Sequence, residues 1–214
     1  MYLPLESDVV DKSWKSWRTF TTSWLSYTTV GGVPSVHIGT TWWFKITQPY
    51  PFQPDNTKPL TFSFLFYVTT VQSSSRRTIA DRWTTNYNRI WFALRENTSN
   101  IEFAIDYNNS NTVDLKSSIP SANAWHHAVF TCSTTAAKMY IDWALTDSSS
   151  GVANPRWRWA YSHDNTQWMF CSRNVNSYDQ AFNWNAREVI FEEAEWTSQE
   201  VADYYAEIKA KLWI

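Results

Sequence analysis

The sequence has little charge and no cluster of basic residues. Asp, Glu, Lys and Arg make up 18% of its 214 residues, against about 25% in an average soluble domain, and the net charge is −2 at pH 7. No run of Lys and Arg is longer than two residues. Because affinity for phosphate depends on clustered positive charge, the sequence excludes nucleic acid as an expected partner.

The sequence also lacks the features of a membrane-inserted or secreted chain. No apolar stretch approaches the roughly 20 residues that cross a bilayer, so we expect no membrane insertion. The first residues, Met1 to Glu6, lack the basic and apolar regions of a signal peptide. We therefore expect the chain to be made and first folded in the cytoplasm.

Cysteine is scarce, and the histidines do not form a metal motif. Cys132 and Cys171 are too few and too far apart for a metal knuckle, so we expect buried thiols, with a disulfide between two strands as the alternative. His126 and His127 are adjacent, so on a strand their side chains point to opposite faces and cannot hold one metal ion. A structural role is expected for each.

Aromatic residues are abundant instead: the chain has 15 Trp, 11 Tyr and 12 Phe. So many cannot all lie in the core, and an exposed ring can stack on a sugar or anchor a protein interface. The candidate carbohydrate- or partner-binding residues are Trp42, Trp43, Trp83, Tyr87, Trp157 and Trp159, with Trp14 and Trp17 as a further cluster.

Alternating apolar and polar residues predict a series of strands. Residues 125–132 and 136–145 form a half-buried hairpin around a short Ser/Thr turn, and residues 60–68 place Phe62, Phe64, Phe66 and Val68 on one face. Further strands are expected over residues 35–46, 78–80, 89–94, 101–105, 168–171 and 186–191. Before residue 35 we expect one short strand followed by loops, and we also expect loops over residues 146–151 and 172–185.

The end of the sequence predicts one helix. Thr197 and Glu200 have the spacing of a capping box, and Trp196 can pack on Val201 as a hydrophobic staple. Apolar and aromatic residues then recur at helical spacing as far as Leu212.

Three segments resemble the laminin G-like members of the concanavalin A-like lectin/glucanase superfamily. They are the hairpin around Trp125-His126-His127, the strand Leu60–Val68, and the closing strand and helix. The resemblance implies an all-β fold: a concanavalin A-like jelly-roll β-sandwich of two antiparallel sheets with a short C-terminal helix, as a single domain over residues 1–214. Two residues depart from the family pattern: Trp143 replaces a turn glycine, and Arg187 replaces an acidic residue.

The resemblance also bears on chemistry. Related hydrolases carry an E-x-D-x-E run on one strand for glycoside cleavage, and this sequence has none. The acidic pairs Glu102/Asp106 and Glu193/Glu195 do not replace it, so we expect no enzyme activity. Laminin G-like modules often hold calcium, for which Asp106, Asp142 and Asp164 are the candidate ligands. No other cofactor is expected.

The sequence therefore predicts a non-catalytic structural or adhesive module. The first hypothesis is a virus or phage particle surface protein, such as a decoration or fibre component, whose partners are other structural subunits or copies of itself. The alternative is a free carbohydrate-binding lectin, extracellular by a route without a signal peptide, and the remote alternative is a glycoside hydrolase.

Overall fold

A computed structural model describes the following parts of the chain: residues 2–3, 19–23, 26–38, 43–48, 59–69, 77–83, 89–95, 100–107, 110–133, 135–150, 168–170 and 184–212. Within several strands it describes the backbone alone.

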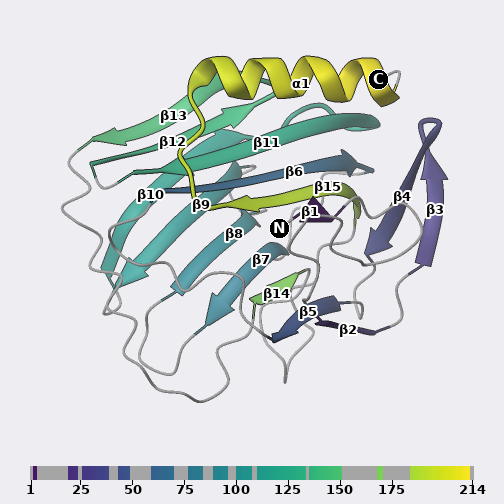
Figure 1. The fold of residues 1–214 in the computed structure, drawn as a ribbon, viewed down its shortest axis with the longest axis horizontal. Coiled ribbons are helices and arrows are strands. Elements are labelled where there is room, and N and C mark those ends of the chain that lie inside the picture. Colours follow the sequence, from purple (N-terminus) through teal and green to yellow (C-terminus); the bar gives the residue numbers. More distant parts are fainter. Residues whose placement is uncertain are drawn as a thin grey trace.

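The described residues form strands followed by one helix (Figure 1). The elements are β1 (Tyr2–Leu3), β2 (Thr19–Ser23), β3 (Ser26–Val30), β4 (Val33–Ile38), β5 (Trp43–Gln48), β6 (Leu60–Val68), β7 (Arg77–Trp83), β8 (Arg89–Arg95), β9 (Asn100–Tyr107), β10 (Ser110–Ser118), β11 (Ala124–Cys132), β12 (Ala136–Ile141), β13 (Ala144–Ser150), β14 (Trp168–Phe170), β15 (Trp184–Glu192) and α1 (Ser198–Leu212).

The strands make two antiparallel sheets. The first has the order β13-β12-β11-β6-β15-β4-β3, with β1 paired to β15, and the second has the order β10-β9-β8-β7-β14-β5-β2. Strands adjacent in a sheet are often far apart in sequence, as in the pairing of β6 with β11 and β15. This arrangement confirms the predicted jelly-roll β-sandwich.

Strand β6 is the centre of the first sheet. Its nine residues Leu60–Val68 are those predicted, and all except the half-buried Tyr67 are buried. The inner face carries Phe62, Phe64 and Phe66, whose rings lie in a row with centroids 5.3 and 5.1 Å apart. Apolar residues on both faces are what a strand needs when both of its faces are covered.

The core between the sheets is aromatic and aliphatic. Phe130 of β11 stacks on Phe103 of β9, so the two rings join the first sheet to the second. Both side chains are at most 1% exposed. Leu115 and Val113 of β10 are also buried.

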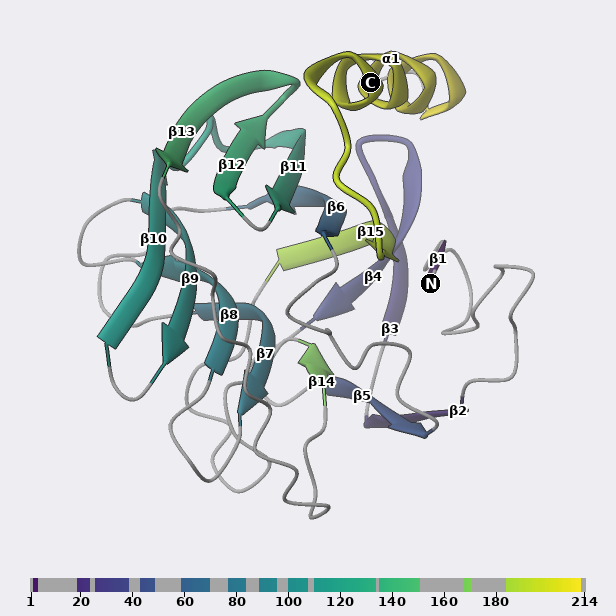
Figure 2. The ribbon, with the colours of Figure 1, turned by 60° about the vertical axis from the view of Figure 1, so that its left-hand side comes forward.

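Helix α1 lies outside the sandwich, against the first sheet (Figure 2). The predicted capping box is present: the Glu200 carboxylate accepts from the Thr197 amide at 2.7 Å, and the Thr197 hydroxyl accepts from the Glu200 amide at 3.2 Å. The predicted staple is confirmed as well, because Trp196 packs on a buried cluster of Val129, Tyr140 and Val201.

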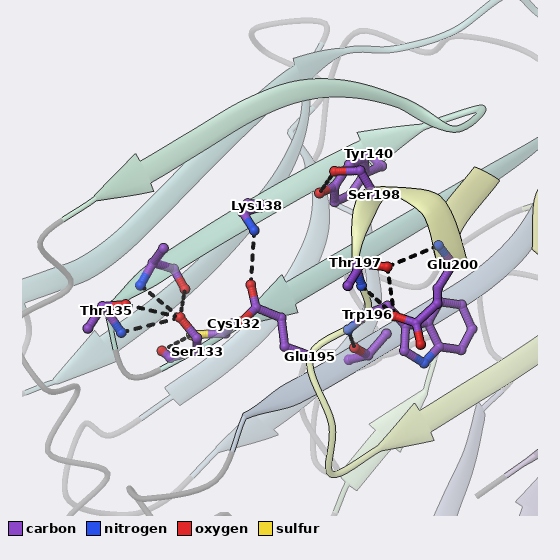
Figure 3. Close-up of polar contacts among 12 residues, drawn as sticks. Cys132, Ser133, Thr135, Lys138, Tyr140, Glu195, Trp196, Thr197, Ser198 and Glu200 are labelled. Atoms are coloured by element: carbon purple, nitrogen blue, oxygen red, sulfur yellow. Dashed lines mark hydrogen bonds and ion pairs between the residues drawn. The ribbon is translucent and has the colours of Figure 1, made fainter. Parts of the chain in front are cut away.

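Polar contacts fix the start of α1 on the sheet (Figure 3). Lys138 of β12 forms an ion pair with Glu195 at 3.0 Å, and the Tyr140 hydroxyl lies 3.0 Å from that of Ser198. The Thr61 hydroxyl donates to the Ala194 carbonyl at 2.6 Å and accepts from the Trp196 amide at 3.0 Å. The helix therefore has a fixed position over β6, β11 and β12.

The position of α1 over the first sheet corrects one prediction. The hairpin was expected to be half-buried, yet residues 126–132 of β11 are buried on both faces. The inner face packs between the sheets, and α1 covers the outer face. Cys132 is a buried free thiol, as expected, and burial raises its pKa to about 12.

Several edge strands were predicted as loops. β13 occupies most of the stretch expected as a loop after the hairpin, and β2 and β3 occupy a region expected to be irregular. The run 35–46 is not one strand, because β4 and β5 belong to different sheets. β15 also begins at Trp184, two residues earlier than expected. β3 and β13 are exposed along much of their length, which removes the apolar alternation that marks a half-buried strand.

Candidate functional site

Most aromatic candidates from the sequence lie outside the described residues: Trp14, Trp17, Trp42, Tyr87, Trp157 and Trp159. For two others the backbone alone is described. Trp43 begins β5 and Trp83 ends β7. β5 and β7 flank β14 and run parallel to each other, so Trp43 at the start of β5 and Trp83 at the end of β7 stand at opposite ends of these strands and do not form one site.

The described surface instead presents an exposed apolar pair at the β12–β13 hairpin. Trp143 is 57% exposed and Leu145 is 54% exposed. Leu145 pairs with Tyr140 of the neighbouring strand, so both side chains lie on the face of the sheet that α1 covers nearer its centre. We call Trp143 and Leu145 the edge patch. Tyr27, the other exposed aromatic among the described residues, lies on β3 at the far edge of the same sheet.

The backbone under the edge patch is strained. Ile141 pairs with Ala144, so Asp142 and Trp143 form a two-residue turn, with φ values of 48° and 70°. Such turns favour Asn, Asp and Gly, because a left-handed backbone costs roughly 1–2 kcal/mol for other residues. The family pattern has glycine at the position of Trp143. The tryptophan thus adopts a strained backbone there, although its ring is largely exposed and burial of the ring contributes little stability.

The Asp142 carboxylate holds this turn against β11. Its Oδ1 accepts from the His127 amide at 2.9 Å, and its Oδ2 lies 2.7 Å from His126 Nδ1. The Asp142 amide in turn donates to the His127 carbonyl at 2.8 Å. These three bonds fix the direction in which Trp143 leaves the sheet.

The His126 ring lies between two acceptors. Nδ1 faces the Asp142 carboxylate, and Nε2 is 2.8 Å from the Ser121 carbonyl oxygen. A neutral ring has one N–H, so only the imidazolium donates to both. Burial opposes the charge, but the bonds to Asp142 and Ser121 and the charge of Asp142 outweigh it and raise the pKa of His126 above 6.5.

His127 is the opposite case. It lies under α1, where its ring stacks on Tyr205, and its Nε2 is 2.7 Å from the Ser63 hydroxyl. Its Nδ1 has no hydrogen-bond partner. Complete burial lowers the pKa of His127 from 6.5 to about 4, although the nearby charge of Asp142 acts against the shift. The side chains of the two histidines face opposite sides of the sheet, as predicted. The surroundings of His126 favour its protonated form, and those of His127 favour its neutral form.

Of the calcium candidates, Asp142 is the one whose side chain the structure describes. Both of its oxygens already accept hydrogen bonds. Asp106 lies on β9 of the other sheet, with the backbone alone described, and Asp164 lies outside the described residues. The described part of the chain holds no group of three or more His, Cys, Asp or Glu residues able to bind a metal ion. It also contains no helix long and apolar enough to span a bilayer.

Two packed antiparallel sheets with one covering helix define a lectin-like jelly roll. The family model described as the concanavalin A-like lectin/glucanases superfamily, of laminin G type, matches residues 39–202. The chain therefore belongs to this superfamily, as the three sequence segments indicated. No curated protein matches the sequence.

Solved structures share the fold at low identity. The binding domain of botulinum neurotoxin DC, in complex with rat synaptotagmin II, is similar with a TM-score of 0.75 and 14% identity over 96% of this chain and 50% of that chain. The binding domain of botulinum neurotoxin serotype G gives a TM-score of 0.74 and 13% identity over 98% of this chain and 51% of that chain. This chain thus spans about half the length of these structures, and the likeness shows the fold.

Sequence reasoning overlooked the edge patch, although one signal was present. Trp143 stood out as the residue that replaces a turn glycine, and a large aromatic at such a turn must project from the sheet. Leu145 gave no signal, because it was counted as the end of an alternating strand. Its exposure follows from the position of β13 at the sheet edge.

Proposed function

We propose that this chain is a non-catalytic binding module that contacts its partner through the edge patch. The observation that carries the proposal is Trp143, 57% exposed at a φ of 70°. The position is costly for a tryptophan and contributes little to the core, so its ring is best explained by a contact outside the chain.

The acidic residues support a non-catalytic role. The sequence has no E-x-D-x-E run on a strand. Glu102 is fully buried, and Glu195 forms an ion pair with Lys138 that fixes the helix. Neither residue offers a carboxylate on an open surface for glycoside cleavage.

The partner that we favour is another structural protein of a virus or phage particle, with this chain at the particle surface as a decoration or fibre component. An exposed Trp and an exposed Leu two residues apart on one hairpin supply the apolar anchor of a protein interface, where aromatic residues are enriched and Lys and Glu are depleted. A second copy of the chain is one such partner.

The experiment begins with native source material. Particles are sedimented, and mass spectrometry measures whether this chain accompanies them at stoichiometric abundance. Recombinant chain is then added to particles that lack it. We expect the W143A variant to bind at least about tenfold more weakly, which is typical of an aromatic hot spot. The matched control is Y27A, which removes an exposed aromatic at the far edge of the sheet. A chain that stays monomeric and never sediments with particles would contradict the proposal.

The second candidate function is a free lectin, and the open face of Trp143 favours it because such a ring can stack on the apolar face of a sugar. A glycan array with the wild-type chain and W143A tests this candidate. Binding that is lost in the variant supports a lectin, and an empty array counts against it.

A further inference from the structure

Residues of α1 and β15 enclose a pocket of about 290 Å³. It is lined by Glu188, Ile190, Tyr204, Glu207, Ile208 and Lys211. The four helix residues recur every three or four positions and so share one face of α1. The pocket lies over β15, whereas the edge patch lies beyond β12, so they are two separate surfaces.

The buried carboxylate of Glu188 lines the pocket, and this residue lies at a break in the register between β15 and β6. Glu188 has a φ of 52° and lies at a register shift between Arg187 and Ile190. Bulges of this kind redirect a side chain. The Glu188 side chain is 2% exposed, and its Oε1 is 3.3 Å from Arg187 Nε and 3.2 Å from Lys211 Nζ. Two cations of the chain itself therefore compensate this buried charge.

The mouth of the pocket carries a second carboxylate. Glu207 is exposed and forms no hydrogen bond or ion pair with any other described residue. Lys211, the other charged group on this helix face, points its ammonium group to Glu188. The last turn of α1 adds the negative end of the helix dipole, which favours a cation. Among the charged side chains that line the pocket, Glu207 is thus the one without a partner among the described residues.

The remaining walls are apolar or aromatic. Ile190 and Ile208 supply aliphatic surface, and Tyr204 supplies a ring. The volume lies just below the roughly 300–1,000 Å³ of pockets that take drug-sized ligands, so it suits a single side chain. A ligand that matches these groups has an apolar stem and a cationic head.

We propose that this pocket receives an arginine side chain of a partner protein. The aliphatic stem would pack between Ile190 and Ile208, and the guanidinium would form a bidentate pair with the Glu207 carboxylate. This proposal does not depend on the edge patch or on the identity of the particle. It adds a charged anchor on the other side of α1.

The test uses the whole chain with isoleucine methyl groups labelled for NMR. The probe is arginine blocked as the N-acetyl N-methylamide, and the comparison is blocked citrulline, which has the same shape without the charge. We expect the arginine probe to shift the Ile190 and Ile208 methyl signals and to bind about tenfold or more tightly than citrulline. Salt should weaken the binding of arginine, because the contact is an exposed ion pair.

Variants locate the contact. E207Q should reduce affinity for the arginine probe about tenfold, whereas D203N should leave it unchanged. Both variants remove one negative charge from an exposed position of α1, and Asp203 does not line the pocket. Equal binding of citrulline, equal binding by E207Q, or no shift at either isoleucine up to the solubility limit of the probe would overturn the proposal. A lysine probe that binds more tightly than arginine would also overturn it.

Discussion

His127 makes the protein sensitive to acid. Its ring is buried between β6 and α1, with Ser63 on one nitrogen and no partner on the other, and its pKa is lowered from 6.5 to about 4. In the unfolded chain the ring takes up a proton near pH 6.5, whereas in the folded chain it resists until about pH 4. The stability that this neutral ring contributes is therefore complete above pH 6.5 and is lost as the pH falls toward 4.

The size of the effect follows from the two pKa values. Each pH unit between them corresponds to about 1.4 kcal/mol, so the fall from 6.5 to about 4 corresponds to roughly 3 kcal/mol in total. At pH 5 the loss already amounts to roughly 2 kcal/mol. This is a large share of the 5–15 kcal/mol by which a typical domain is stable.

Urea unfolding followed by circular dichroism measures this loss at several values between pH 7 and pH 4.5. The H127Q variant keeps a neutral side chain that can bond to Ser63, so it lacks this proton uptake while every other titrating group is retained. We expect H127Q to be less stable than wild type at pH 7 and to recover roughly 2 kcal/mol relative to wild type by pH 5. If the two stability curves run parallel over this range, the account of His127 is wrong.

Other predictions concern the hairpin, the core and the helix. H126Q should lower the free energy of unfolding most below pH 6.5, where the imidazolium bonds to both acceptors. This loss should shrink as the pH rises through the raised pKa of His126, and the same urea series measures it. W143G should raise the free energy of unfolding by roughly 1 kcal/mol, because glycine adopts positive φ freely, and it should weaken partner binding in the sedimentation assay. T197A should lower the free energy of unfolding by about 0.5–2 kcal/mol through loss of the capping box, as seen in urea unfolding. F130A should lower it by about 3–5 kcal/mol, because Phe130 joins the two sheets; a loss under 1 kcal/mol would contradict this.

The sequence allowed the buried parts of the fold to be predicted. β6 matched its predicted bounds because a central strand is apolar along its whole length, and α1 was found because its cap, staple and spacing are all local. The edge strand β13 was missed because exposed serines carry no period-two pattern. The bulge at Glu188 was missed for a different reason, since it depends on pairing between β15 and β6.

The candidate site was harder to predict than the fold. Trp143 could be recognised as unusual from the sequence, but its exposure depends on the hairpin reaching the edge of the sheet. The pocket depends on α1 crossing β15, so Glu188 and Glu207, which are distant in sequence, meet only in the folded chain. Contacts of this kind are set by the arrangement of the elements, which local spacing does not encode.

The two histidines act together on the turn that presents Trp143. Asp142 accepts from the ring of His126 and from the backbone amide of His127, so both residues stabilise the same hairpin. Acid destabilises the fold through the buried ring of His127, which resists protonation, and alkali weakens the bond between Asp142 and His126, whose ring needs its proton. The contribution of His127 is complete above pH 6.5, whereas that of His126 is complete below pH 6.5 and falls as the pH rises through its raised pKa. We therefore expect the two residues together to contribute most near pH 6.5. Partner binding should weaken on both sides of this value in wild type, and H126Q should remove the loss on the alkaline side.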